Sequence, residues 1–303
     1  MKIGILSKSP EIYSTKRLFE SAEARGHSVR VINPIRCTMT IEEAHPTVRY
    51  GEEELASFDA IIPRIGSSIT FYGTAVVRQF EMMGVFVANE SVAISRSRDK
   101  LRSLQILSKN GVGLPTTCFA HSTHSTADLI RSIGGAPLVI KILEGTQGKG
   151  VVLAETPKAA ESVIDAFRGL SEHFLVQEFI EEAEGTELRL FVVGGKVIGS
   201  MMRRSDASDL VRLPSRRKSQ AVTVEISQEE RETARRAVRA LGLNIAGVDI
   251  LRSRKGPVVM EVNSSPSLEA IEKVTGEDLA SPVIEFIEQS YQKLSKINRG
   301  DGF

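Results

Sequence analysis

Three side chains near the end of the chain, Asp249, Glu261 and Asn263, carry oxygen atoms that can bind a metal ion. They lie in two β-rich runs that meet at Ser253-Arg-Lys-Gly256, which predicts an antiparallel hairpin. Because side chains alternate between the faces of a strand, Glu261 and Asn263 share a face, and the hairpin can bring Asp249 opposite them. Such groups are costly to bury unless a cation binds them, and Mg²⁺ combines few carboxylates with phosphate oxygens and water. A polar strand face turned toward solvent is the alternative explanation of these three residues alone.

A glycine-rich segment in the middle of the chain has the composition of a phosphate-binding turn. It contains Gly145, Thr146, Gln147, Gly148 and Gly150. The segment is not a Walker loop, since it lacks the Gly-Lys-Ser/Thr signature and joins two strand-like runs where a Walker loop joins a strand to a helix. A hairpin of this kind can fold over phosphates and donate backbone N–H groups to them. An ordinary loose turn is the alternative.

Two lysines accompany this segment. Lys141 belongs to the apolar run directly before it, and Lys100 belongs to the predicted helix that leads into the same part of the chain. Ammonium groups anchored on a strand and on a helix act as point charges for the α and β phosphates of a nucleotide. Each lysine taken singly is more typical of a solvated surface charge, so only the combination favours a nucleotide site.

Two further strand-like runs carry side chains suited to the rest of a nucleotide. Gln177, Glu178 and Phe179 end one run, with backbone groups for an adenine edge and an aromatic ring beside them. Glu187 and Arg189 lie two apart on the next run and therefore share a face. They form either a surface ion pair or a pair that holds a ribose or phosphate and an acyl group.

Strands and helices alternate in residues 1–97, which predicts a parallel, doubly wound sheet. No G-x-G-x-x-G follows the first strand, so the usual dinucleotide-binding fingerprint is absent. The expected strands span residues 3–6, 29–32, 59–65 and 85–88, and the expected helices span 14–25 and 74–83.

The remaining chain divides into two further parts and a tail. We expect a central α+β unit at residues 98–185, a subdomain with an antiparallel sheet at 186–295 and a flexible tail at 296–303. A capping box at Ser227 and Glu230 predicts the helix that precedes the hairpin. The other expected strands span 138–143, 151–154, 174–180, 187–193 and 196–201, and the other helices are one helix over 91–107, then 157–169 and 282–294.

Composition narrows the class of protein. The chain has 303 residues, 41% hydrophobic and 25% charged, and its formal net charge of +1 gives no general field for nucleic acid or membrane. The two cysteines, Cys37 and Cys118, lie far apart, which excludes a disulfide scaffold and fits a reducing compartment. The histidines form no zinc-binding pattern. The apolar N-terminal run is too short for a signal peptide, and no run is long enough to span a bilayer, so we expect a cytoplasmic protein.

Taken in order, these motifs closely resemble those of the ATP-grasp superfamily: Arg98-Asp-Lys100, Val139-Ile-Lys141, the glycine-rich segment, Gln177-Glu178-Phe179, Val248-Asp249 and Met260-Glu261-Val-Asn263. Within it, Pro63-Arg-Ile-Gly66 and Asn89-Glu-Ser-Val-Ala93 are similar to stretches of the RimK family, ligases that add glutamate to the C-terminus of a small-subunit ribosomal protein. The resemblance covers nearly the whole chain. It implies an ATP-grasp fold of α/β and α+β character, with an N-terminal doubly wound parallel sheet, a central lid subdomain and a C-terminal antiparallel sheet subdomain.

The resemblance also implies a role for each motif. Asp249, Glu261 and Asn263 are expected to hold two Mg²⁺ ions, for which Mn²⁺ can substitute. A substrate carboxylate would attack the γ-phosphate of ATP to give an acyl phosphate, and the amine of L-glutamate would then displace phosphate to form an amide. The acceptor is expected to be the C-terminus of a ribosomal protein and the assembly a homotetramer, with no direct nucleic-acid site and no membrane contact. The expected nucleotide contacts are Lys100, Lys141, Gly145, Thr146, Gln147, Gly148, Gly150, Gln177, Glu178, Phe179 and Glu187.

Two stretches depart from the family pattern. Relatives carry Phe-Arg-Ser-Asn-Leu-His-Arg-Gly-Gly after the strand at 196–202, whereas residues 208–220 here have neither the Asn nor the Gly-Gly, and Arg212 is the candidate replacement for the Arg. Ser267 and Ala270 stand where two glycines are usual.

The expected catalytic residues are Arg189, Arg204 and Arg212. Three functions remain open: a RimK-like glutamate ligase, a related ATP-grasp amide ligase with a small-molecule or carrier-protein acceptor, and an ATP-binding regulatory protein with impaired ligase activity. The altered stretch at 205–220 and its basic cluster favour the third function.

Overall fold

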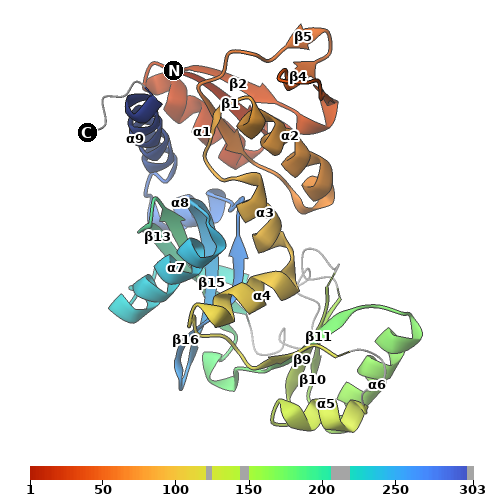
Figure 1. Cartoon of the computed structure of the whole chain (residues 1–303). Helices are drawn as coiled ribbons and strands as arrows, with labels where there is room; N and C mark the ends of the chain where they lie inside the picture. Colours follow the sequence, from red (N-terminus) through yellow and green to blue (C-terminus); the bar gives the residue numbers. More distant parts are fainter. Residues whose placement is uncertain (121–124, 144–149, 206–218, 299–303) are drawn as a thin grey trace.

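The computed structural model describes residues 1–120, 125–143, 150–205 and 219–298. These residues form three parts, which follow one another through the molecule in Figure 1. The N-terminal part lies at one end, the C-terminal sheet lies in the middle, and the central part of the sequence lies at the other end. The order of the parts in space therefore differs from their order along the chain.

The N-terminal part is built on a parallel sheet, as the alternation of strands and helices predicts. Its strands follow the order β2-β1-β6-β7, and each neighbouring pair is parallel. Ile3 and Ile5 of β1 are fully buried, as is typical of an inner strand with both faces covered. A small antiparallel sheet of β3, β4 and β5 stands beside it. The bounds are β1 Lys2–Leu6, α1 Tyr13–Ala24, β2 Ser28–Ile32, η1 Pro34–Arg36, β3 Cys37–Thr40, β4 Thr47–Tyr50, β5 Glu53–Glu54, β6 Ala60–Pro63, η2 Ser67–Ile69, α2 Thr70–Met82 and β7 Phe86–Val87.

The single helix expected over residues 91–107 is wrong, because the structure has two helices there, α3 (Ser91–Arg98) and α4 (Lys100–Lys109). Asp99 between them has an extended backbone with φ −80° and ψ 102°. Its side chain accepts a hydrogen bond from the backbone N–H of Arg102 at 3.0 Å and so caps α4. Lys100 therefore stands at the first position of a new helix, which fixes the direction from which its side chain starts.

The central part is a four-stranded antiparallel sheet in the order β10-β9-β11-β8. Leu138 and Ile140 of β9 pack with Ile130 of α5 and Ile164 of α6, so both helices cover the same face of the sheet. The alternate positions of β9, among them Lys141, point to the other face. The bounds are β8 Thr117–Cys118, α5 Thr126–Ser132, β9 Leu138–Ile142, β10 Val151–Ala154, α6 Pro157–Gly169, β11 Phe174–Glu178 and η3 Glu181–Ala183.

The C-terminal part is a five-stranded antiparallel sheet in the order β14-β13-β12-β15-β16. Leu190 and Val248 on one face of the sheet pack with Val238 of α7 in a shared apolar core. α7 begins at the predicted capping box, in which the side chains of Ser227 and Glu230 each accept a hydrogen bond from the other residue's backbone N–H. The bounds are β12 Thr186–Val193, β13 Lys196–Ser205, β14 Ser219–Val222, α7 Gln228–Leu241, β15 Ile245–Ser253, β16 Gly256–Asn263 and α8 Glu269–Thr275.

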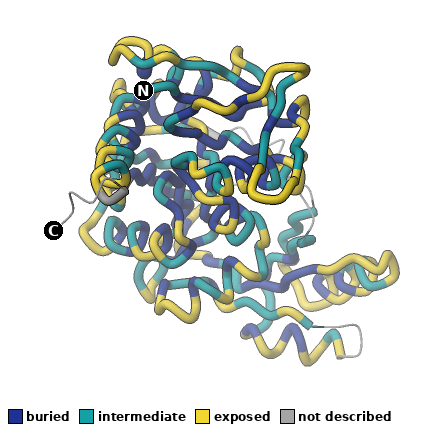
Figure 2. Tube along the Cα trace, turned by 45° about the horizontal axis from the view of Figure 1, so that its top comes forward, coloured by how far each residue is buried: buried dark blue, intermediate teal, exposed yellow. Residues whose placement is uncertain are grey.

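The last helix, α9 (Ala280–Asn298), packs against α1 of the N-terminal part (Figure 1). Arg25 after α1 forms ion pairs with Glu285 and Glu288 of α9 at 3.1 and 2.7 Å. Leu18 of α1 shares an apolar core with Phe191 of β12. Figure 2 shows the buried residues gathered in the interior of the molecule, with exposed residues on its outer turns. The N-terminal and C-terminal parts are thus joined by a common core, and residues 299–303 of the expected tail lie outside the described residues.

Asn89 holds the N-terminal part to both ends of the C-terminal hairpin. Its Nδ2 donates to the backbone oxygens of Ile245 at 2.7 Å and Ser264 at 3.1 Å. Its Oδ1 accepts from the backbone N–H groups of Asn244 at 2.8 Å and Ile245 at 3.0 Å. All hydrogen-bonding atoms of the Asn89 side chain therefore bind the C-terminal part, and the N-cap residue of α3 is Glu90.

Candidate active site

One face of the C-terminal sheet carries the acidic and basic side chains that the sequence singles out. The register of β12 and β15 aligns Arg189 with Asp249. The guanidinium donates from Nε to Oδ1 at 2.6 Å and from Nη2 to Oδ2 at 2.5 Å, and the Asp249 side chain is only 4% exposed. Burial alone would lower the pKa of Arg189, but the attraction of Asp249 and its hydrogen bonds raise the pKa above the usual value. Arg189 is therefore a fixed cation that orients Asp249.

A β-bulge in the hairpin brings the predicted metal ligands to this face. From the turn, β15 and β16 pair residue for residue as far as Ile250 with Val259, and the next pair is Asp249 with Glu261. Met260 is thus the extra residue on β16. If the intact strands instead continued to pair residue for residue, Asp249 would lie opposite Met260 and Glu261 would point to the other face of the sheet.

Asp249, Glu261 and Asn263 share one face, as the hairpin prediction requires. Asn263 Nδ2 lies 3.4 Å from Asp249 Oδ2. Glu261 is accessible to solvent, yet protein surrounds it closely, and this burial together with the charge of Asp249 raises the pKa of Glu261. A divalent cation would relieve that repulsion, so the set fits a hard metal ion. No group of three or more His, Cys, Asp or Glu side chains in the described ranges could by itself hold a metal ion. Two carboxylates with one amide favour Mg²⁺, which keeps water and phosphate ligands.

The central sheet presents Lys141 toward these carboxylates. Lys141 Nζ donates to Gln177 Oε1 at 2.6 Å, and Gln177 Nε2 donates to Thr117 Oγ1 at 2.8 Å. Burial lowers the pKa of Lys141 to about 8, while the charges of Glu261 and Glu187 oppose the decrease. The ammonium is therefore held in place on β9 beside the C-terminal carboxylates, where an anionic ligand would favour its charged form.

Lys100 is bound at the point where the glycine-rich segment begins. Its Nζ donates to the backbone oxygens of Ile142 at 3.0 Å and Leu143 at 2.8 Å. Burial lowers the pKa of Lys100, and Glu261 opposes this change. Gly150 at the other end of the segment has φ +77°, and a Cβ there would meet the side chain of Ile142 at 2.9 Å, so the turn requires glycine. The other predicted residues of the segment lie outside the described ranges: Gly145, Thr146, Gln147 and Gly148.

Glu187 pairs with Arg203, which the sequence analysis did not select. β12 and β13 place the two residues opposite each other, and Nη1 lies 3.5 Å from Oε2. Burial, supported by the charge of Asp249, raises the pKa of Glu187 to about 7. The next residue, Arg204, is exposed and by alternation points to the opposite face of the sheet. The structure thus brings Arg203, and not Arg204, to the charged face, and Arg212 lies outside the described residues.

Glu178 and Phe179 stand at the end of β11. Glu178 accepts a hydrogen bond from the backbone N–H of Thr116 at 3.0 Å and from Lys255 Nζ at 3.4 Å, and the Thr116 bond is the main reason why the pKa of Glu178 is lowered. Strand alternation puts the Glu178 side chain on the opposite face from Gln177, and Phe179, which directly follows the strand, is half-buried. Gln177 therefore contacts Lys141, whereas the carboxylate of Glu178 is already hydrogen-bonded to the backbone N–H of Thr116.

The pairing of Glu187 with Arg203 has no signal in the sequence. A second bulge, between Phe191 and Val192, shifts β13 by one residue, so that counting from the Gly194-Gly195 turn would put Met202 opposite Glu187. Two other functional candidates, Arg64 and Arg98, lie in stretches that resemble the family but received no role. Their proximity depends on the packing of the N-terminal part, which strand patterns do not encode.

Lys141 on the central sheet and Lys100 on the helix α4 accompany an antiparallel sheet that carries Asp249, Glu261 and Asn263, and this arrangement is that of an ATP-grasp fold. Residues 97–287 match the RimK-like ATP-grasp domain, and residues 1–94 match the RimK PreATP-grasp domain. The chain belongs to the RimK-like ATP-grasp family, which confirms the resemblance.

Close relatives span the same length. A protein of Syntrophotalea carbinolica named probable alpha-L-glutamate ligase is 62% identical over 302 residues, with 100% of each chain covered. A protein of Hydrogenovibrio crunogenus with the same name is 60% identical over 302 residues, again with 100% of each chain covered. Among solved structures, the ATP-grasp ligase PsnB, solved with a minimal precursor, gives a TM-score of 0.74 at 21% identity and covers 95% of this chain and 98% of its own. A further PsnB structure contains a phosphomimetic precursor variant, Mg and ADP. These likenesses confirm the ATP-grasp fold, and none of the described helices is long and apolar enough to cross a membrane.

Proposed function

We propose that the protein is an ATP- and Mg²⁺-dependent carboxylate–amine ligase that adds L-glutamate to the C-terminus of a small-subunit ribosomal protein. The observation that carries the proposal is the placement of Lys100 and Lys141 beside Glu261, where both charges oppose the rise of its pKa, on the face that also carries Asp249 and Asn263. Close relatives carry the name of a probable alpha-L-glutamate ligase, which supports glutamate as the amino acid. A ligase of the same fold has been solved with Mg and ADP, which supports the nucleotide and the metal.

The two lysines would bind the phosphates of the nucleotide. Lys141 is held by Gln177, so its ammonium needs little rearrangement to accept a phosphate oxygen. Lys100 now donates to the carbonyls of Ile142 and Leu143, at the start of the glycine-rich segment. Exchange of those carbonyls for phosphate oxygens would couple nucleotide binding to the position of the segment.

The oxygen set would hold the metal, and Arg189 would keep it oriented. Asp249, Glu261 and Asn263 present their oxygens on one face, and Arg189 fixes Asp249 through two hydrogen bonds. Bound Mg²⁺ neutralises the charge that develops on the transferred phosphoryl group. Arg203 and Arg189 on the same face add positive charge beside the reacting groups.

The reaction that fits this site has two steps. An oxygen of the acceptor carboxylate forms a bond to the γ-phosphorus of ATP, the bond to the bridging oxygen breaks, and ADP leaves. The nitrogen of L-glutamate then forms a bond to the carbonyl carbon of the acyl phosphate, inorganic phosphate leaves, and the amine loses a proton. Exclusion of water by the glycine-rich segment would protect the acyl phosphate.

The experiment measures ADP release with ATP, Mg²⁺ and candidate C-terminal peptides of ribosomal proteins, with and without L-glutamate, followed by intact-mass analysis of the peptides. We expect glutamate-dependent ADP release and added glutamyl units. Glu261→Gln should abolish turnover, while the matched control Glu269→Gln, an exposed residue paired with Lys273 on α8, should retain it. ADP release without a modified peptide would point to a small-molecule or carrier-protein acceptor, and nucleotide binding without ADP release would point to a regulatory protein.

Two further expectations belong to this proposal. The altered stretch at 205–220 predicts weak glutamate transfer with normal nucleotide binding, and robust turnover in the same assay would contradict it. The expected homotetramer is tested by light scattering of the purified chain.

A further inference from the structure

Two arginines outside the charged face, Arg64 and Arg98, lie where the N-terminal part meets the C-terminal part. Arg64 follows β6, and its Nη2 donates to the backbone oxygen of Pro266 at 2.6 Å. Arg98 ends α3, and its Nη2 donates to the backbone oxygen of Ile65 at 2.6 Å. Burial lowers the pKa of Arg64 to about 10, and the nearby charge of Arg98 contributes to the decrease. Two like charges are thus brought together in surroundings poor in water.

In the part of the chain that the structure describes, neither arginine forms an ion pair with a carboxylate. Burial also lowers the pKa of Arg98, and the charge of Glu261 only partly opposes it. Two adjacent guanidinium groups are costly to bury without a counter-ion, and the backbone carbonyls that they contact carry no net charge. The pair therefore lacks an anion.

Unpartnered hydrogen-bonding atoms gather at the same place. Only five buried side-chain nitrogen or oxygen atoms lack a partner among the described residues, and three of them are Arg98 Nε, Ser264 Oγ and Ser265 Oγ. The other two belong to Arg168 of α6. Buried polar atoms are nearly always hydrogen-bonded in native proteins, so a cluster of three points to a ligand that supplies the missing acceptors.

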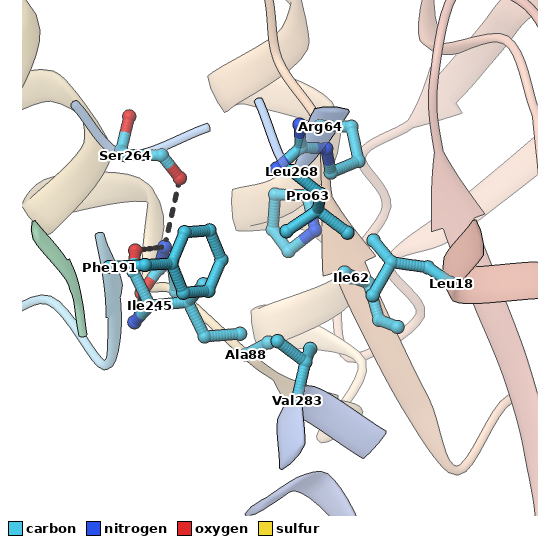
Figure 3. A pocket seen from close by; sticks show the side chains of 11 residues that line it. Leu18, Ile62, Pro63, Arg64, Ala88, Phe191, Ile245, Ser264, Leu268 and Val283 are labelled. Carbon is cyan, nitrogen blue, oxygen red and sulfur yellow. Dashed lines mark hydrogen bonds between the residues drawn. The ribbon is translucent and has the colours of Figure 1, made fainter. Parts of the chain in front are cut away.

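Ser264 and Arg64 are brought together by the packing of the two parts. Both line a small cavity whose other walls include Ile62 and Phe191 (Figure 3). Its volume of about 10 Å³ admits about one water molecule. The cavity itself is therefore too small for a ligand, but it shows that Arg64 of one part and Ser264 of the other border the same space.

The cluster adjoins the metal end of the charged face. Ser264 and Ser265 directly follow Asn263, and Glu261 lies close enough to Arg98 to influence its pKa. We infer that Arg64, Arg98 and the hydroxyls of Ser264 and Ser265 bind the α-carboxylate of the incoming amino acid. This inference rests on the proposed ligase function.

The position of this arginine and serine cluster beside Asn263 and Glu261 suits the α-carboxylate of the incoming amino acid. In an α-amino acid the amine and the α-carboxylate are attached to the same carbon, so a site that fixes one of them also fixes the other. Arginine forms paired hydrogen bonds to a carboxylate, and serine hydroxyls can donate to its remaining lone pairs. A carboxylate held beside Asn263 and Glu261 would present the amine to an acyl phosphate at the metal end.

The test measures binding of radiolabelled L-glutamate to the full chain by equilibrium dialysis in the presence of ADP and Mg²⁺. Arg98→Ala should weaken binding about ten- to a hundredfold, because it removes a charged hydrogen-bond donor, and Arg98→Lys should restore part of it. Ser265→Ala should weaken binding about three- to tenfold and tests the site if Arg98→Ala does not fold. Arg168→Ala is the matched control, since it also removes a guanidinium with unpartnered buried atoms, and it should leave binding unchanged.

A second ligand identifies the carboxylate. L-isoglutamine keeps the amine and the side-chain carboxylate but has an amide in place of the α-carboxylate, so its weaker binding should not change further in Arg98→Ala. ADP binding should change less than twofold in every variant. The inference is overturned if both Arg98→Ala and Ser265→Ala bind L-glutamate with wild-type affinity. It is also overturned if these variants lose binding of the acceptor peptide and keep binding of L-glutamate. Failure of the wild-type chain to release ADP in response to glutamate would instead overturn the proposed function.

Discussion

Replacement of Asn89 by alanine removes four hydrogen bonds from the junction between the N-terminal and C-terminal parts. The side chain is 2% exposed and contacts the backbone at the start of β15 and just after β16. A net contribution of about 1 kcal/mol for each bond gives a loss of about 3 to 5 kcal/mol in the free energy of unfolding, since the buried backbone partners are left unsatisfied. For a chain of this size the thermal midpoint should fall by roughly 6 to 10 °C.

Urea denaturation followed by far-ultraviolet circular dichroism measures this loss, because the chain contains no tryptophan. Asn110→Ala is the matched control, since Asn110 Nδ2 makes one exposed hydrogen bond, to Ile106 at 2.8 Å. The control should lose no more than about 1 kcal/mol. Asn89→Asp should be at least as harmful as Asn89→Ala, because a carboxylate oxygen would face the carbonyls of Ile245 and Ser264. A loss below about 1 kcal/mol in Asn89→Ala, or one equal to that of the control, would refute the reasoning.

Three other outcomes are expected. Lys141→Met should raise the KM for ATP about tenfold or more through loss of a phosphate contact, whereas Lys273→Met, on the exposed side of α8, should leave it near the wild-type value in steady-state assays. Arg203→Gln should reduce kcat more than Arg204→Gln, because only Arg203 lies on the charged face beside Glu187, and equal losses would contradict the strand register. Burial would raise the pKa of Glu230, but hydrogen bonds from Arg252 and Ser227 hold it below its usual value, so its contribution to stability is present above a pH of about 4.3 and is lost as the pH falls through the folded pKa. Glu230→Gln should therefore flatten the acid side of a plot of unfolding free energy against pH, and an unchanged slope would speak against it.

Elements with a local signal were predictable. The hairpin of β15 and β16 follows from two β-rich runs around a short turn, and the capping box at Ser227 follows from a serine and a glutamate three residues apart. The helix break at Asp99 was missed because apolar residues continue on both sides of it. An aspartate can be a helix residue or a cap, and tertiary packing selects the cap.

The site was predictable in its residue types but less so in its geometry. Lys141, Asp249 and Glu261 were found because each interrupts an apolar strand with a charge. Their partners depend on register: the contact of Lys141 with Gln177 is set by the pairing of β9 with β11, and that of Glu187 with Arg203 by a bulge. Strand alternation gives the face of each residue within an element, but bulges and packing between the parts decide which faces meet.

The bulge at Met260 shifts by one residue the alternation of β16 side chains between the two faces of the sheet. Between the turn and Val259, even-numbered residues of β16 face the central part, and beyond Met260 the odd-numbered residues do so. Because of this one inserted residue, Val258, which packs against apolar side chains, lies on the same face as Glu261 and Asn263. Deletion of Met260 would therefore leave Glu261 and Asn263 on the face of Asp249, and it is regular pairing of the intact strand that would turn them to the core face.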